Sequence, residues 1–105
     1  MTLFEAKLIP NYPGYIITNT GEIWSNHLGK PKKLKLYIHG SKGYLQVGLY
    51  NGHKQTCLVH RLVAEHFLST FKKSEDVHHK NFNPENNCID NLEMTFRDGN
   101  HRRYN

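Results

Sequence analysis

Two adjacent histidines, His78 and His79, stand at the entrance of the stretch VHHKNFNPENNCIDNL at residues 77–92. Imidazole changes its protonation state near neutral pH and is also a common metal ligand. Neighbouring residues on a strand point to opposite faces. One ring can therefore face a metal ion while the other addresses a different point of the same site. A further ligand has to come from elsewhere in the chain, and the final residues offer Asn100 and His101.

The residues after the histidine pair are rich in asparagine, which favours turns because its amide bonds nearby backbone groups and tolerates left-handed geometry. The sequence therefore predicts an ordered loop held by its own side chains, from Asn81, Asn83, Asn86, Asn87 and Asn91. We interpret Asn86 and Asn87 as loop-builders rather than as ligands. Cys88 leaves open a structural zinc site shared with the histidines, since Cys and His are the usual ligands of zinc.

The elements that must position these residues begin with a small antiparallel sheet in the first sixty residues. Residues 15–18 and 22–25 flank Asn19-Thr20-Gly21, a hairpin turn by residue type. Residues 34–40 alternate apolar and polar side chains and predict a further strand. Between the predicted strands 44–50 and 53–60, Asn51-Gly52 is a strong two-residue hairpin signal.

The pattern then changes from strands to a short helix at 60–67, where Leu62, Val63 and Phe67 fit one face. Strands are expected at 77–80 and 92–96, and a short final helix at 97–105, with Asp98 as its cap. The expected class is α+β, with a small N-terminal antiparallel sheet and a short helix before a strand, loop, strand and helix. We place the division between residues 1–69 and 70–105, within one compact unit.

The composition favours a soluble, basic protein. The chain has 105 residues, with 14 Lys plus Arg against 9 Asp plus Glu, for a net charge of +5. A basic surface favours a polyanion, of which nucleic acid is the commonest. Cys57 and Cys88 form no CxxC pair, which argues against a disulfide scaffold. No signal peptide or membrane-spanning run is evident, so we expect a reduced cytoplasm and no membrane partner.

The basic residues that could contact nucleic acid are densest at residues 30–35, KPKKLK. As a set, beside the strand residues Tyr37, Tyr44 and Tyr50, they suit a sheet laid against a duplex. Contacts of this kind are mostly to phosphate and make the affinity depend on salt. The residues assigned to this role are Lys30, Lys32, Lys33, Lys35, Lys80, Arg97, Arg102 and Arg103.

The spacing of the histidine pair, Asn91 and Asn100 resembles the HNH nuclease motif, in the stretch VHHKNFNPENNCIDNLEMTFRDGN. Two upstream stretches, YPGYIITNTGEIWS and LVHRLVAEHFL, are similar to segments that precede this motif in phage-intron HNH homing endonucleases. Three such stretches in the family's order are stronger evidence than any one alone. The resemblance implies a ββα-metal fold at the C-terminal end and cleavage of double-stranded DNA, with no small-molecule substrate. It also implies a phage or mobile-element setting in a bacterial host.

The resemblance also implies roles for individual residues. His79 corresponds to the general base, His78 to the first metal ligand and Asn100 to the last ligand, with His101 as a weaker candidate for that place. Asn91 corresponds to the middle asparagine, whose amide pins the loop and whose backbone helps to orient the base. One divalent ion is implied, and Mg, Mn, Ni and Zn stay open because the ligand set is neutral.

A second function from another class stays open at this point. The chain can instead be a non-catalytic DNA-binding module in which the histidines hold a structural zinc ion. His79 separates the two readings, since a structural zinc site needs no unliganded imidazole beside it.

Overall fold

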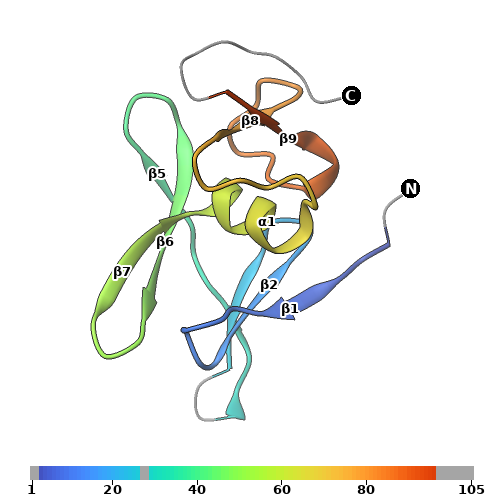
Figure 1. Ribbon diagram of the computed structural model, residues 1–105. Coiled ribbons are helices and arrows are strands. Elements are labelled where there is room, and N and C mark those ends of the chain that lie inside the picture. The colour runs from blue at the N-terminus through green and yellow to red at the C-terminus, as the bar shows by residue number, and fades with distance from the viewer. Residues whose placement is uncertain (1–2, 27–28, 97–105) are drawn as a thin grey trace.

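The computed structural model describes residues 3–26 and 29–96. A single helix, α1 (Val59–Phe67), lies at the centre of this part of the chain, among three antiparallel sheets (Figure 1). This arrangement confirms the predicted α+β class. The predicted final helix at 97–105, with the Asp98 cap, lies outside the described residues. Within them, no helix has the length and apolar character needed to cross a membrane.

The first sheet has four strands in the order β1 (Ala6–Leu8), β2 (Tyr15–Thr18), β3 (Ile23–Ser25) and β4 (Lys32–Lys33). The predicted turn at residues 19–21 joins β2 to β3. Gly21 has a φ of +91°, a left-handed conformation that suits glycine because it has no Cβ. The alternating burial of β2 places Tyr15 and Ile17 in the core.

The second sheet contains β5 (Tyr37–His39), β6 (Tyr44–Tyr50) and β7 (Lys54–Leu58). The hairpin predicted at Asn51-Gly52 is present between β6 and β7, where Gly52 has a φ of +104°, but its connection has three residues, 51–53. The return strand predicted at 53–60 ends at Leu58, because α1 begins at Val59. The seven-residue strand β6 carries Val47 and Leu49, both buried, toward the core.

The predictions of a single N-terminal sheet and of a strand at 34–40 were wrong. The structure has two sheets in this region, and the segment 34–36 passes from one to the other. The Leu34 N–H donates to Ile23 O at 2.8 Å and so still belongs to the first sheet. Only Tyr37–His39 are a strand, and Ile38 is exposed. The apolar alternation at 34–40 therefore marks a segment that passes between two sheets, because its leucines pack on the margin of the core while Ile38 does not.

The third sheet is the hairpin of β8 (Asp76–His79) and β9 (Leu92–Thr95), and the 3-10 turn η2 (Ile89–Asn91) leads into β9. It lies on the opposite side of α1 from β1 and β2 (Figure 1). The bounds of β8 and β9 agree with the predicted strands to within one residue. The helix α1 starts one residue earlier than predicted. The asparagine-rich loop connects the two strands.

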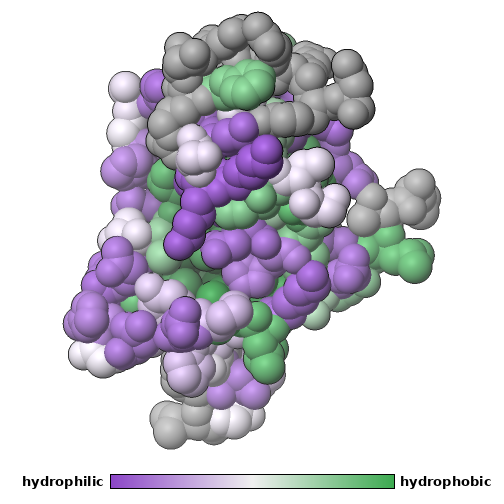
Figure 2. All heavy atoms as spheres, viewed as in Figure 1, coloured by the Kyte–Doolittle hydropathy of each residue, from purple (hydrophilic) through white to green (hydrophobic). Residues whose placement is uncertain are grey.

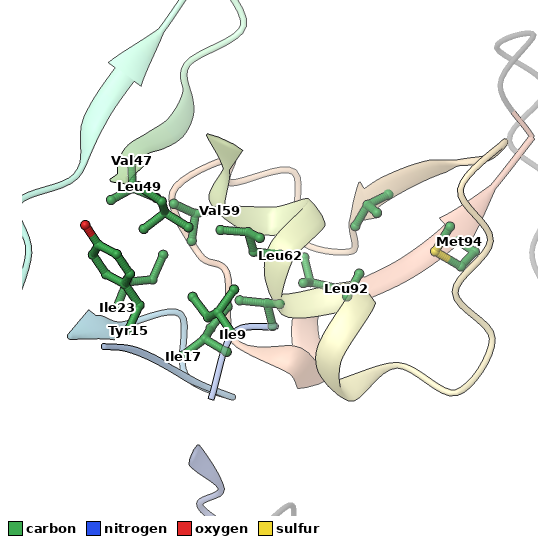
Figure 3. Packing of buried hydrophobic residues seen from close by; sticks show 13 residues of the cluster. Ile9, Tyr15, Ile17, Ile23, Val47, Leu49, Val59, Leu62, Leu92 and Met94 are labelled. Atoms are coloured by element: carbon green, nitrogen blue, oxygen red, sulfur yellow. The ribbon is translucent and has the colours of Figure 1, made fainter. Parts of the chain in front are cut away.

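One hydrophobic core around α1 joins residues from all three sheets (Figure 3). Val59, Leu62 and Val63 lie on the buried face of the helix, and Leu92 and Met94 reach it from β9. Hydrophilic residues cover most of the face seen in Figure 2, in keeping with the mean hydropathy of −0.70. Since both halves contribute to this core, the C-terminal hairpin is positioned by the N-terminal sheets.

Candidate active site

The strand β8 places the two adjacent histidines on opposite faces, as predicted. His79 points toward the core and is only 5% exposed, while His78 is more accessible. Across the hairpin, His78 pairs in register with Glu93, and its Nε2 lies 3.8 Å from Glu93 Oε2. Backbone pairing with β9 therefore sets the direction of both imidazoles.

The loop after β8 is held by asparagine side chains, as the composition predicts. The amide nitrogen of Asn91 donates to Asn81 Oδ1 at 3.0 Å and to Asn86 O at 2.9 Å. Asn91 Oδ1 accepts from the Asn81 N–H at 3.1 Å, and its backbone carbonyl accepts from the Lys80 N–H at 2.8 Å. Asn91 thus ties the start of the loop, next to His79, to its end.

The hydrogen bond to the His79 ring comes from a different asparagine. Nε2–H of His79 donates to Oδ1 of Asn87 at 2.8 Å, and both side chains are buried. An amide oxygen only accepts, so this bond places the ring proton on Nε2 and leaves Nδ1 as the basic nitrogen. Asn87 is a loop residue, as interpreted from the sequence, but it also contacts the proposed base.

Two more aromatic rings pack against His79. The centroid of the His60 ring lies 5.1 Å from that of His79, and the Tyr44 ring lies 4.6 Å from His60 and 5.8 Å from His79. His60 is 4% exposed, and its Nδ1 has no hydrogen-bond partner within residues 3–26 and 29–96. A histidine beside a helix is usually a structural residue with satisfied ring nitrogens, and the Nδ1 of His60, unpaired among the described residues, departs from this. The ring Nδ1–H of His66, on the same helix, donates to Leu62 O at 2.7 Å.

Burial governs the charge of both buried histidines. It lowers the pKa of His60 to about 4, aided by the nearby His79 and Arg61. Burial also lowers the pKa of His79, a shift opposed by its hydrogen bond to Asn87 and reinforced by the charge of His78. A histidine with a depressed pKa is neutral at pH 7. His79 is therefore neutral at pH 7, with Nδ1 as its basic nitrogen.

A pocket of about 300 Å³ brings the histidine pair together. Both His78 and His79 border it, although His79 is almost entirely buried. Phe82 also lines this pocket; its ring makes a T-shaped contact with that of His78, and its backbone has a left-handed φ of +63°. The other residues that line it are Lys42, Tyr44, Val77 and Pro84.

The described residues fit a divalent metal ion in part. Among them, no three His, Cys, Asp or Glu side chains form a cluster that could hold a metal ion. His78 supplies an imidazole nitrogen, and the Glu93 carboxylate beside it supplies negative charge that the neutral ligand set lacked. Asn100 and His101, the other predicted ligands, lie outside the described residues. Cys57 and Cys88 are free thiols.

Some of the residues predicted to contact DNA lie within the part of the chain that the structure describes, and others lie outside it. Lys30, Lys32, Lys33, Lys35 and Lys80 are exposed, whereas Arg97, Arg102 and Arg103 lie outside the described residues. A groove of about 350 Å³ brings Lys32, Lys33 and Lys35 together with residues of β5, β6 and β7. Besides these lysines, its polar and aromatic lining includes Tyr37, Gln46, Tyr50, Lys54 and Thr56.

Sequence reasoning missed three residues that contact His79, which are Tyr44, His60 and Asn87. The Asn86-Asn87 pair was visible as part of the motif, so its position beside the histidines was the available signal. Tyr44 and His60 precede His79 by 35 and 19 residues, and no local pattern connects them to it.

Comparison with known proteins gives a consistent result. The HNH endonuclease family matches residues 57–102. The chain is 41% identical over 90 residues to DNA endonuclease I-HmuI of Bacillus phage SP01, a match that covers 84% of this chain and 50% of that protein. It is 39% identical over 95 residues to the H-N-H endonuclease F-TflII of Escherichia phage T5, covering 88% and 48% of the two chains.

A solved structure, described as DNA binding and cleavage by the HNH homing endonuclease I-HmuI, superposes with a TM-score of 0.80. The two chains are 38% identical, and the match covers 90% of this chain and 53% of that one. The chain thus spans about half the length of these relatives. The match of residues 57–102, the similarity over most of the chain and the shared fold agree: this chain carries an HNH endonuclease domain at residues 57–102 and resembles HNH homing endonucleases over most of its length.

Proposed function

We propose that this protein is a metal-dependent DNA endonuclease that hydrolyses a phosphodiester bond, with one active site that cuts one strand. The observation that carries the proposal is the histidine pair. His78 and His79 point to opposite faces of β8 and still border the same pocket. The activity named for I-HmuI and F-TflII supports the same chemistry.

In this proposal, His79 is the general base. The Asn87 bond leaves Nδ1 free to accept a proton from an attacking water, and burial keeps the ring neutral. His78, with Asn100 or His101, would hold a divalent ion. Such an ion supplies electrostatic stabilisation of the charge that develops on the phosphate and on the departing 3′ oxygen. Asn91 keeps the loop in the conformation that these roles need.

DNA binding is assigned mainly to residues 1–69 and hydrolysis to residues 70–105. The lysine-lined groove between the first two sheets has the charge that a phosphate backbone requires. The tyrosines beside it add apolar and hydrogen-bonding surface for the sugar and base edges. The phage origin of I-HmuI and F-TflII supports a phage setting, with the enzyme acting in the bacterial cytoplasm.

Cleavage of supercoiled plasmid tests the proposal directly. In separate reactions with Mg, Mn, Ni and Zn ions, we expect at least one metal to give nicked circles. We expect the plasmid to stay intact when a chelator is added. The reaction product is read on an agarose gel over time. Intact plasmid with all four metals, accompanied by retained DNA binding, would favour the non-catalytic binding module instead.

Replacing His78 should weaken metal binding without unfolding the protein, because its ring is only partly buried. We expect His78→Ala to lower the affinity for Mn²⁺ or Ni²⁺ by at least roughly tenfold, in line with the loss of one ligand. Isothermal titration of the metal into the protein, in the absence of DNA, measures this. His53→Ala, which removes an exposed histidine outside the site, is the control. An unchanged titration curve for His78→Ala would count against the assignment.

A further inference from the structure

The hairpin turn between β2 and β3 packs directly on Asn87, the residue that bonds His79. A Cβ placed on Gly21 would lie 3.0 Å from Asn87 Cβ, 3.2 Å from its carbonyl oxygen and 3.3 Å from its carbonyl carbon. Contacts this close to backbone atoms cannot be relieved by a side-chain rotation. The turn therefore fits against the loop only because residue 21 is glycine.

The turn is itself held firmly on both sides. Asn19 is buried, and its side chain accepts from the Glu5 N–H at 3.1 Å and donates to Leu3 O at 2.7 Å. The backbone carbonyl of Asn19 accepts from the N–H of Ile89 at 2.8 Å, and Ile89 follows Asn87 by two residues. Thus one N-terminal residue ties the chain start to the end of the asparagine loop.

Asn87 is consequently fixed from two directions. Its backbone meets the turn at Gly21, and the chain two residues later is hydrogen-bonded to Asn19. Its side chain is 4% exposed and reaches Nε2 of His79 at 2.8 Å. A buried amide with so little freedom can determine both the orientation of the imidazole and which of its nitrogens carries the proton.

We propose that Asn87 is a positioning residue for the general base, and that the turn at residues 19–21 holds Asn87 in the position this requires. The N-terminal sheet is then part of the nuclease site, in addition to any contact that it makes with DNA. This inference rests on the proposed function, in which His79 accepts the proton. The competing interpretation is that Asn87 only shapes the loop, as Asn81 and Asn83 do through their backbone bonds.

The side-chain part of the proposal is tested with Asn87→Leu and Asn87→Asp. Leucine has a similar size but no acceptor, while aspartate keeps an acceptor oxygen at the same place. We expect Asn87→Leu to lower kcat for plasmid cleavage by roughly 10²-fold, the scale of a misplaced catalytic group, with DNA affinity unchanged. We expect Asn87→Asp to retain most of the activity, because it still accepts from Nε2–H.

A second readout does not depend on cleavage. The ring nitrogens of His79, observed by NMR in labelled protein without metal or DNA, report the tautomer. In the wild type and in Asn87→Asp we expect the proton on Nε2, and in Asn87→Leu a mixture of both tautomers. Resonances of core residues such as Leu92 and Met94 establish that the variants are folded. A folded Asn87→Leu protein with the wild-type tautomer and the wild-type kcat would overturn the proposal.

The turn is tested with Gly21→Ala against Gly52→Ala. Both glycines have positive φ, +91° and +104°, so alanine brings a similar backbone strain at each. Of these two glycines, Gly21 has neighbours within 4 Å of the added Cβ, whereas at Gly52 none of the described residues comes that close. We expect Gly21→Ala to lower kcat and shift the His79 tautomer, and Gly52→Ala to do neither. Equal effects of the two substitutions would show that strain, rather than contact with Asn87, is responsible.

The outcomes for this inference and for the proposed function are separable. If the wild type does not cut, the proposed function fails, while the tautomer measurements still show whether Asn87 and the turn control His79. If the wild type cuts and Asn87→Leu cuts equally well, the function stands and the positioning role falls.

Discussion

Replacing His79 with alanine should leave a folded protein that binds DNA and cuts supercoiled plasmid more slowly by roughly 10² to 10⁴-fold, the range that a general base contributes. The reason is the position of this ring, which borders the same pocket as His78 and keeps a basic nitrogen through its bond to Asn87. Initial nicking rates at saturating metal, together with binding to a short duplex by gel shift, measure the two effects separately.

Because His79 is buried, truncation to alanine also opens a cavity that destabilises the protein. A second variant is therefore needed to distinguish this loss of stability from the loss of the basic nitrogen. His79→Gln fills more of the space and can still hydrogen-bond to Asn87, but it has no basic nitrogen. We expect it to be as inactive as His79→Ala while being more stable. His39→Ala, at an exposed position on β5, is the matched control and should cut at the wild-type rate. Wild-type cleavage by a folded His79→Gln protein would remove His79 from the mechanism.

The second large effect concerns acid stability, through His60. Burial lowers the pKa of this ring from about 6.5 to about 4 in the folded protein. The unfolded chain therefore binds a proton at a higher pH than the folded one does. The contribution of neutral His60 to the free energy of unfolding is complete above pH 6.5 and decreases as the pH falls toward 4. Below pH 4 the contribution no longer changes. From this difference we expect a loss of about 3 kcal/mol in the free energy of unfolding over this range.

The substitution His60→Phe tests this because it keeps an aromatic ring beside Tyr44 and His79 and cannot be protonated. Urea unfolding at a series of pH values from 7.5 to about 4 gives the free energy for each protein. The wild type should lose more stability than His60→Phe, and the difference between them is the contribution of His60. His79, whose pKa is also lowered, has the same sign of dependence in both proteins. Parallel curves for the two proteins would mean that His60 does not titrate with a depressed pKa.

Much of the fold could be predicted from the sequence because its signals are local. The turns at Asn19-Thr20-Gly21 and Asn51-Gly52 depend on backbone angles that few residues adopt, and both occur where predicted. The helix is marked by the spacing of its apolar residues. The strand predicted at residues 34–40 was wrong over its first half, because a local pattern does not show which sheet a segment joins. The Leu34 N–H bonds to Ile23 O in the first sheet, and only Tyr37–His39 form a strand of the second.

The chemistry of the site was readable because a short stretch of chain contains most of it. The adjacent His78 and His79 must point to opposite faces of any strand, and the loop asparagines must bond to nearby backbone, whatever surrounds them. Those constraints require no knowledge of the rest of the molecule. The sequence therefore determined the kind of residues at the candidate site and their order, and the resemblance to HNH nucleases supplied the proposed class of reaction.

Contacts between distant parts of the chain were decided by the tertiary structure alone. Gly21 reaches Asn87, and Tyr44 and His60 stack beside His79, because one small core brings three sheets against a single helix. Burial in that core also lowers the pKa of both histidines, which no spacing in the sequence records. Such effects depend on which surfaces exclude water together, and that is settled only when the whole chain packs.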